Sequence, residues 1–297
     1  MDRPLTVLAA AAALVFPGVA AAAPVPASVA AAPVVPRLDG PVAARIADLR
    51  AQGRRLGARP GVFAKAGDSI TESASFLQDI GCGAGSLGAH RALAPTIAYF
   101  RRTRFDPGLT SAWCEVANSF TRASAAAVAG WDAGAALAPA RGLPGCPGAV
   151  APIDCELRRL RPATVLIEFG TNDLERFGDR RRFRGDLGAI VRRVAARGAV
   201  PVLFTIPPRR DRAVFAARVG SYNAEIVALG ARERIPVANY WRALALGGVP
   251  GDGLDADGIH PSLCGTSAAD FTPAGLRCGY NVRNLVALEA LAALRRR

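Results

Sequence analysis

The chain has 297 residues, of which 51% are hydrophobic and 21% are charged, and its formal net charge is +13. This composition is typical of a globular protein with a core and excludes a largely disordered chain. Lys65 is the only lysine, and the arginines are scattered, with runs only at Arg180–Arg182 and Arg295–Arg297. Because no basic stripe with interleaved aromatic residues is present, we expect no specific nucleic-acid partner, while peripheral contact with an anionic envelope stays open.

The first 40 residues differ from the rest of the chain. Arg3 precedes an apolar run, Leu5–Phe16, that is too short to span a bilayer, and small residues follow at Ala20–Ala23. This pattern predicts a signal peptide over residues 1–22, with an uncleaved membrane anchor as the alternative. Residues 23–40 are rich in Ala, Pro and Val and predict a flexible linker. We expect residues 41–297 to form a single catalytic domain.

Apolar runs alternate with amphipathic segments along this domain. The runs predict buried strands over residues 61–67, 163–170, 200–208 and 235–241. Helical spacing of apolar residues predicts helices over 41–57, 184–198, 213–234 and 281–294. Residues 78–160 are rich in Gly, Ala and Pro and predict long loops with short helices. The alternation predicts an α/β fold with a parallel sheet that helices cover on both faces, and with ligands beyond the carboxyl ends of the strands.

Six cysteines follow the predicted signal peptide, an even number that agrees with an oxidising compartment. Fifteen pairings are open to six cysteines. Because closing a short loop costs less entropy, we expect the pairs Cys82–Cys114, Cys146–Cys155 and Cys264–Cys278. None forms a CxxC pair and the chain holds two histidines, so no zinc site is expected, and no cofactor.

Two polar segments follow predicted strands directly. In AGDSIT (66–71), Gly67 ends a strand and Ser69 presents a hydroxyl at the carboxyl edge of the sheet, beside the N–H groups of the next turn. In FGTND (169–173), the amide of Asn172 can donate to a developing oxyanion. Each segment alone is also explained as a helix N-cap or as an Asn-Asp turn.

The third segment, DGIHP (257–261), lies near the C-terminus. A serine needs a base to take its proton, and His260 can serve, with Asp257 three residues earlier to orient the imidazole. On its own, this segment is better explained as a surface histidine next to Pro261.

Together, Gly67-Asp68-Ser69, Gly170-Thr171-Asn172-Asp173 and Asp257-Gly258-Ile259-His260 resemble the blocks of the SGNH (GDSL-like) hydrolases, in the family's order. The resemblance covers roughly residues 60–290. It implies a three-layer α/β/α sandwich with a flavodoxin-like parallel sheet, and ester hydrolysis through an acyl-serine without a metal. It assigns Ser69 as nucleophile, His260 as base and Asp257 as the orienting acid. The Ser69 N–H and the Asn172 side chain would hold the oxyanion.

The chain departs from the family in its glycine block, which supplies a third oxyanion N–H. The candidate stretch covers residues 119–134, in which we favour Gly130, with Ser124 or Ala125 as alternatives because a backbone N–H does not require glycine. The long interval between Ser69 and Asn172 predicts an elaborated rim. Trp113 and Trp131 are candidates for its substrate-facing wall, the alternative being that both are packing residues.

The sequence thus predicts a monomeric serine carboxylester hydrolase, secreted or periplasmic, that acts on an acyl ester of a glycan or a lipid. An acyltransferase with the same triad is one alternative. A non-catalytic envelope-binding module on the same fold is another, since fold does not determine function.

Overall fold

The structure is a computed structural model that describes residues 25–106, 110, 112–176, 178–245 and 247–297. The predicted signal peptide lies outside these described residues.

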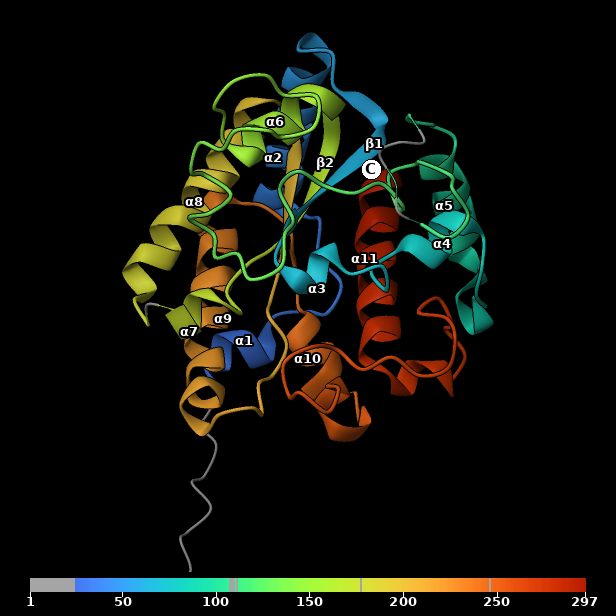
Figure 1. Cartoon of the computed structure of the whole chain (residues 1–297), viewed down its shortest axis with the longest axis vertical. Helices are drawn as coiled ribbons and strands as arrows, with labels where there is room; N and C mark the ends of the chain where they lie inside the picture. Colours follow the sequence, from blue (N-terminus) through green and yellow to red (C-terminus); the bar gives the residue numbers. More distant parts are fainter. Residues whose placement is uncertain (1–24, 107–109, 111, 177, 246) are drawn as a thin grey trace, which may run out of the picture.

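The centre of the molecule is a four-stranded sheet in which all strands are parallel and lie in the order β1-β2-β3-β4 (Figure 1). The strands are β1 (Arg59–Gly67), β2 (Pro162–Glu168), β3 (Val200–Phe204) and β4 (Val237–Ala238). Most of their side chains are apolar toward both faces; in β1, for example, Phe63 packs into one core and Val62 and Ala64 into the other. This double burial explains why the strands appear in the sequence as uninterrupted apolar runs.

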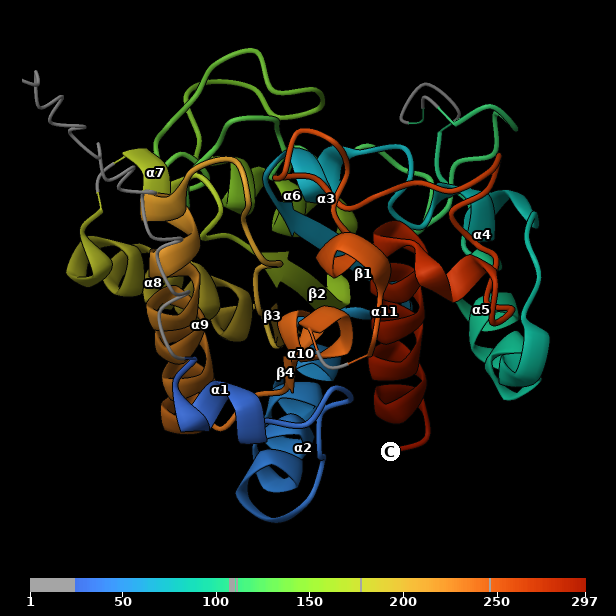
Figure 2. The same cartoon turned by 90° about the horizontal axis from the view of Figure 1, so that it is seen from below.

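Helices cover both faces of the sheet, as predicted, so the fold has three layers (Figure 2). One face carries α2 (Gly40–Arg55), α5 (Ala94–Arg101) and α11 (Gly279–Arg295), and the other carries α6 (Pro152–Leu160), α8 (Arg180–Ala196) and α9 (Ala213–Glu233). Within the described residues, no helix combines the length and the apolar character needed to cross a bilayer. The shorter elements are α1 (Ala27–Ala31), α3 (Ser69–Glu72), α4 (Gln78–Cys82), α7 (Asp173–Arg176) and α10 (Tyr240–Ala245), with 3-10 turns at Gly88–Leu93, Pro250–Gly253 and Gly275–Arg277.

Two strands are shorter than predicted. The strand expected over 200–208 ends at Phe204, and the one expected over 235–241 is β4, of two residues. β4 has only β3 as a neighbour, and the chain turns into α10 at Tyr240. An apolar run alone cannot show where such an edge strand stops pairing.

The region 78–160 contains loops and short helices, as expected, and disulfides join Cys82 to Cys114 and Cys146 to Cys155. The third disulfide joins Cys264 to Cys278, so the pairs are those expected from loop closure. Next to β1, the region makes one parallel bridge, Gly67 with Ala127. Residues around Ala127 therefore lie at the end of β1 from which the chain continues to Ser69.

The segment expected to be a flexible linker over 23–40 instead packs on the domain in its described part. It contains α1, whose Val29 is fully buried in the core beneath α9. The side-chain amide of Asn239 donates to the carbonyl oxygens of Val29 and Ala32. The buried valine and the satisfied carbonyls hold this segment in place, which its composition did not reveal.

Candidate active site

Ser69 begins a short helix immediately after the sharp turn that ends β1. At Gly67, an added Cβ would lie 2.3 Å from Thr71 Oγ1 and 2.6 Å from the carbonyl oxygen of Glu168, so the turn requires glycine. Asp68 then caps α3, its Oδ1 accepting the N–H of Ile70 at 3.0 Å. This turn sets the Ser69 hydroxyl at the carboxyl end of β1.

The structure brings Ser69, His260 and Asp257 into one hydrogen-bonded chain. Ser69 Oγ lies 2.8 Å from His260 Nε2, and His260 Nδ1 lies 2.5 Å from Asp257 Oδ2. Asp257 Oδ1 also accepts the backbone N–H groups of Ile259 and His260, both at 2.9 Å. Partial burial raises the pKa of Asp257, but the hydrogen bonds from His260 and the two backbone groups outweigh it, so the net pKa lies below its usual value. Asp257 is thus held as a carboxylate facing the imidazole.

The loop that carries His260 is anchored on both sides. Leu254 and Pro261 form an antiparallel bridge, and the carbonyl of Gly258 accepts the Arg210 N–H at 2.8 Å. Gly258 has φ +70°, and an added Cβ would lie 2.7 Å from the backbone nitrogen of Asp211. Beyond the histidine, the Cys264–Cys278 disulfide ties the chain to the start of α11. The loop that carries the imidazole is therefore held in place on both sides of His260.

The predicted oxyanion donors lie around the same end of β1. Asn172 Nδ2 donates one hydrogen bond to the carbonyl of Trp131 at 2.9 Å, which orients the amide and leaves its second N–H for a ligand. Gly130, at φ +75°, lies three residues beyond the Gly67–Ala127 bridge. In contrast, the N–H of Ala125 donates to Glu156 at 3.1 Å and is not available. Ser124 precedes the bridge, and its hydroxyl donates to the carbonyl of Lys65.

The two tryptophans differ in position. Trp113 is 68% exposed, and its indole N–H donates to Asp79 at 3.1 Å beside α4. Trp131 is half-buried against the core that includes α8, and its carbonyl holds Asn172. Of the two, Trp131 is the one that directly contacts a candidate site residue.

Arg283, which no motif indicated, lies fully buried beneath the nucleophile. From α11 it donates to Glu168 Oε2 at 3.0 Å, to the carbonyl of Ile70 at 2.9 Å and to Thr71 Oγ1 at 2.9 Å. It thus ties α3 to the end of β2. The only sequence signal was a lone charge within the apolar pattern of the last helix, NVRNLV.

The pKa values of two carboxyl groups beneath the site, those of Asp68 and Asp173, are raised. Burial, and next the charge of Glu168, raise the pKa of Asp68 to about 8. Burial also raises the pKa of Asp173 to about 7. One oxygen of each carboxyl is buried and makes no hydrogen bond within the described chain, which suits a protonated acid.

A cavity of about 150 Å³ lies beside α3. Its lining includes Lys65, Thr71, Gln78 and Arg122, with Val128 on the side of the glycine block. Burial, and next the charge of Arg122, lower the pKa of Lys65 to about 7. Within the described residues, no group of three or more His, Cys, Asp or Glu side chains is arranged to hold a metal ion.

Comparison with known proteins identifies the family whose model this chain matches. The model of the GDSL-like Lipase/Acylhydrolase family matches residues 66–266, about two thirds of the chain. No curated protein matches the chain in sequence.

Among solved structures, the lipase/acylhydrolase from Enterococcus faecalis is 19% identical, with a TM-score of 0.46 over 78% of this chain and 95% of that one. A carbohydrate esterase family 3 from Talaromyces cellulolyticus is 18% identical, with a TM-score of 0.49 over 77% and 97%. A catalytic mutant of an acetylxylan esterase from Geobacillus stearothermophilus is 13% identical, with a TM-score of 0.45 over 77% and 93%. None of the three is similar enough to indicate a substrate for this chain.

Proposed function

Because this chain belongs to the GDSL-like lipase/acylhydrolase family and is an ester-hydrolysing enzyme, we propose that it is an exported serine carboxylester hydrolase. It acts through an acyl-serine intermediate on an acyl ester of a glycan or a lipid. The observation that carries this proposal is the hydrogen-bonded chain from Ser69 through His260 to Asp257, with distances of 2.8 and 2.5 Å.

The chemistry follows from the order of these three groups, with the imidazole between the hydroxyl and the carboxylate. Ser69 Oγ attacks the ester carbonyl while His260 Nε2 takes its proton. Asp257 keeps the other ring nitrogen protonated and stabilises the imidazolium that forms. The imidazolium then returns the proton to the leaving alcohol. Water, activated by the same histidine, releases the acid from Ser69.

The charge that develops on the carbonyl oxygen needs fixed donors. Within the described residues, Asn172 has one N–H left for this role, and the N–H of Ser69, the first of α3, has no partner inside the helix, whereas that of Ile70 donates to Asp68. The Gly130 N–H is the third donor in this proposal. Donors that are already oriented need no rearrangement when the oxyanion forms.

Two observations support the finer parts of the proposal. The cavity beside α3 is small and lined by polar groups; if the acyl group on Ser69 enters it, a short group such as acetyl fits better than a long chain. The three disulfides favour an oxidising compartment and therefore export.

The test is hydrolysis of p-nitrophenyl esters of increasing acyl length by disulfide-intact protein. Ser69→Ala should lower the rate by about three orders of magnitude or more, whereas Ser75→Ala, a matched serine six residues later, should leave it within about twofold. Mass spectrometry after mixing with a slowly turned-over ester should find the acyl group on Ser69.

Three results would count against the proposal. Full activity in Ser69→Ala would show that Ser69 is not the nucleophile. A rate that rises with acyl length would show that the substrate does not carry a short acyl group. Transfer of the acyl group to a sugar or lipid alcohol in preference to water would identify an acyltransferase instead.

A further inference from the structure

A second pocket lies at the opposite end of the sheet from Ser69. Its volume is about 260 Å³, and it opens where the strands begin, near Pro60 and Thr164. Ser69, in contrast, follows the last residue of β1. A ligand in this pocket therefore cannot contact the triad.

The pocket combines apolar walls with a strong positive charge. Its lining contains Arg50, Arg54 and Arg295 and no carboxylate, while Pro60, Phe100 and Leu294 contribute apolar surface. Among the described residues, none of these three arginines takes part in an ion pair.

The buried arginines elsewhere in the chain have carboxylate partners. Arg122 pairs with Glu156, Arg209 with Asp211, and Arg283 with Glu168. Arg50 is half-buried and has no carboxylate partner among the described residues. Because a half-buried charge is costly unless it is paired, an anion in this pocket would stabilise it.

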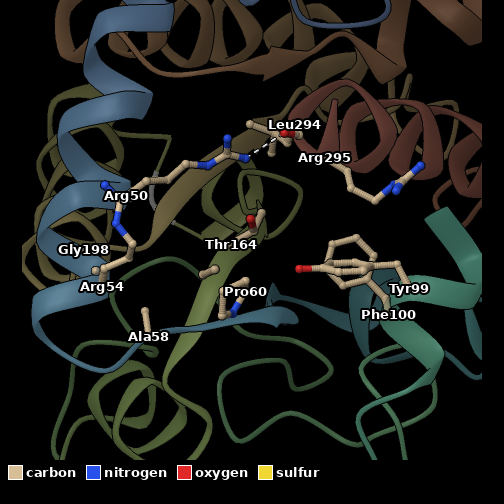
Figure 3. Close-up of a pocket in the computed structure, with 12 residues that line it drawn as sticks. Arg50, Arg54, Ala58, Pro60, Tyr99, Phe100, Thr164, Gly198, Leu294 and Arg295 are labelled. Atoms are coloured by element: carbon tan, nitrogen blue, oxygen red, sulfur yellow. Dashed lines mark hydrogen bonds between the residues drawn. The ribbon is translucent and has the colours of Figure 1, made fainter. Parts of the chain in front are cut away.

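Three polar groups converge on the cavity (Figure 3). Arg50 reaches across it from α2 and donates to the carbonyl of Leu294 at 2.7 Å, which uses one of its five N–H groups. The hydroxyl of Tyr99 points into the space from α5, and Thr164 lies at its base. Arg295 turns away, over the Tyr99 ring and toward Thr96.

Backbone packing sets Arg50 in this position. At Gly53, an added Cβ would lie 2.4 Å from the carbonyl oxygen of Gly198, so α2 lies directly against the turn before β3. Arg50, one helical turn earlier, is thereby held above the cavity. Such prior fixing lowers the entropy that a ligand must overcome on binding.

We propose that this pocket is a second ligand site, which binds a small organic carboxylate. The planar guanidinium of Arg50 matches the fork of a carboxylate, and the hydroxyls of Tyr99 and Thr164 complete the set of donors. The apolar walls take the hydrocarbon part of the ligand. The volume is below the roughly 300–1,000 Å³ typical of pockets for drug-sized molecules, which limits the ligand to a small body such as one aromatic ring.

The experiment titrates sodium benzoate into the full, disulfide-intact protein by calorimetry, with benzamide as the neutral analogue of the same shape. Benzoate should bind about tenfold or more tightly than benzamide, because the charged hydrogen bonds are lost with the neutral ligand. Arg50→Gln should weaken benzoate binding about tenfold, and Tyr99→Phe, which removes only a hydroxyl, about threefold or more.

Two control variants make the result specific. Arg55→Gln removes the same charge from the exposed end of α2 and should leave benzoate affinity within about twofold. Asn172→Ala alters the candidate active site and should also leave it unchanged.

Loss of benzoate binding in Asn172→Ala would place the carboxylate at the active site and overturn the proposal. Unchanged binding in both Arg50→Gln and Tyr99→Phe, or equal affinity for benzamide, would overturn it as well. Tighter binding of phenyl phosphate than of benzoate would refute the carboxylate class. None of these affinity measurements depends on ester hydrolysis. Failure of this proposal can therefore be distinguished from failure of the proposed function.

Discussion

Asp68→Asn should change how the stability of the protein depends on pH. Asp68 is fully buried, and burial and Glu168 raise its pKa from 3.8 to about 8. Between these values the folded state holds a proton that the unfolded chain has lost. The stabilisation is therefore fully present below about pH 4 and is lost as the pH rises to about 8. When the folded state holds one more proton than the unfolded chain, the free energy of unfolding falls by about 1.4 kcal/mol for each unit by which the pH rises.

From pH 5 to pH 7, Asp68 alone should then lower the free energy of unfolding by about 2–3 kcal/mol. Lys65, whose pKa is lowered to about 7, begins to lose its proton in the folded state only near pH 7 and adds little to the slope between pH 5 and pH 7. Asn cannot ionise, and its side-chain oxygen can still accept the Ile70 N–H. The variant should therefore lose the contribution of Asp68 to the pH dependence. It should retain the contributions of Asp173, whose pKa is raised to about 7, and of Glu168, whose pKa is raised by burial.

The assay is urea unfolding of both proteins with disulfides intact, at half-unit steps from pH 5 to pH 7. At pH 5 the variant should be less stable by about 1–2 kcal/mol, since its amide N–H₂ occupies the place of an oxygen that has no partner in the described chain. This difference in the free energy of unfolding between the two proteins should disappear or change sign by pH 7. Parallel stability curves for the two proteins would refute the reasoning, because they would mean that Asp68 takes up no proton on folding.

Three further changes have defined outcomes. Asp257→Asn should lower ester hydrolysis by roughly 10²–10⁴-fold with the fold intact, because the amide no longer stabilises the imidazolium of His260; activity near that of the parent protein, with unaltered circular dichroism, would argue against the triad. Glu156→Gln should lower the free energy of unfolding by roughly 3–5 kcal/mol, since it leaves Arg122 buried without its partner; chemical denaturation measures this, and a loss below about 1 kcal/mol would contradict it. Asn239→Ala should cost about 1–3 kcal/mol and expose the segment around α1 to limited proteolysis, whereas an unchanged cleavage pattern would show that the two amide hydrogen bonds do not hold it.

Local patterns in the sequence were sufficient to predict most strands, the polar segments of the candidate site and the disulfide pairs. Strands buried on both faces produce continuous apolar runs, so β1, β2 and β3 could be recognised without a structure. The segments around Ser69, Asn172 and His260 were visible because glycines and polar residues follow such strands or close a tight loop. The disulfide pairs followed from loop closure, since each joins the nearest cysteine along the chain.

Only the tertiary structure decided which distant groups meet. Ser69 and His260 are 191 residues apart, and nothing local shows that their side chains lie 2.8 Å from each other. Arg283 was hidden in an apolar helix, and Val29 in a segment whose composition resembles a linker. The physical reason is the same in each case. The periodicity of apolar residues shows which face of a helix or strand is buried. Which group pairs with a buried charge or carbonyl depends on how elements far apart in the sequence pack together.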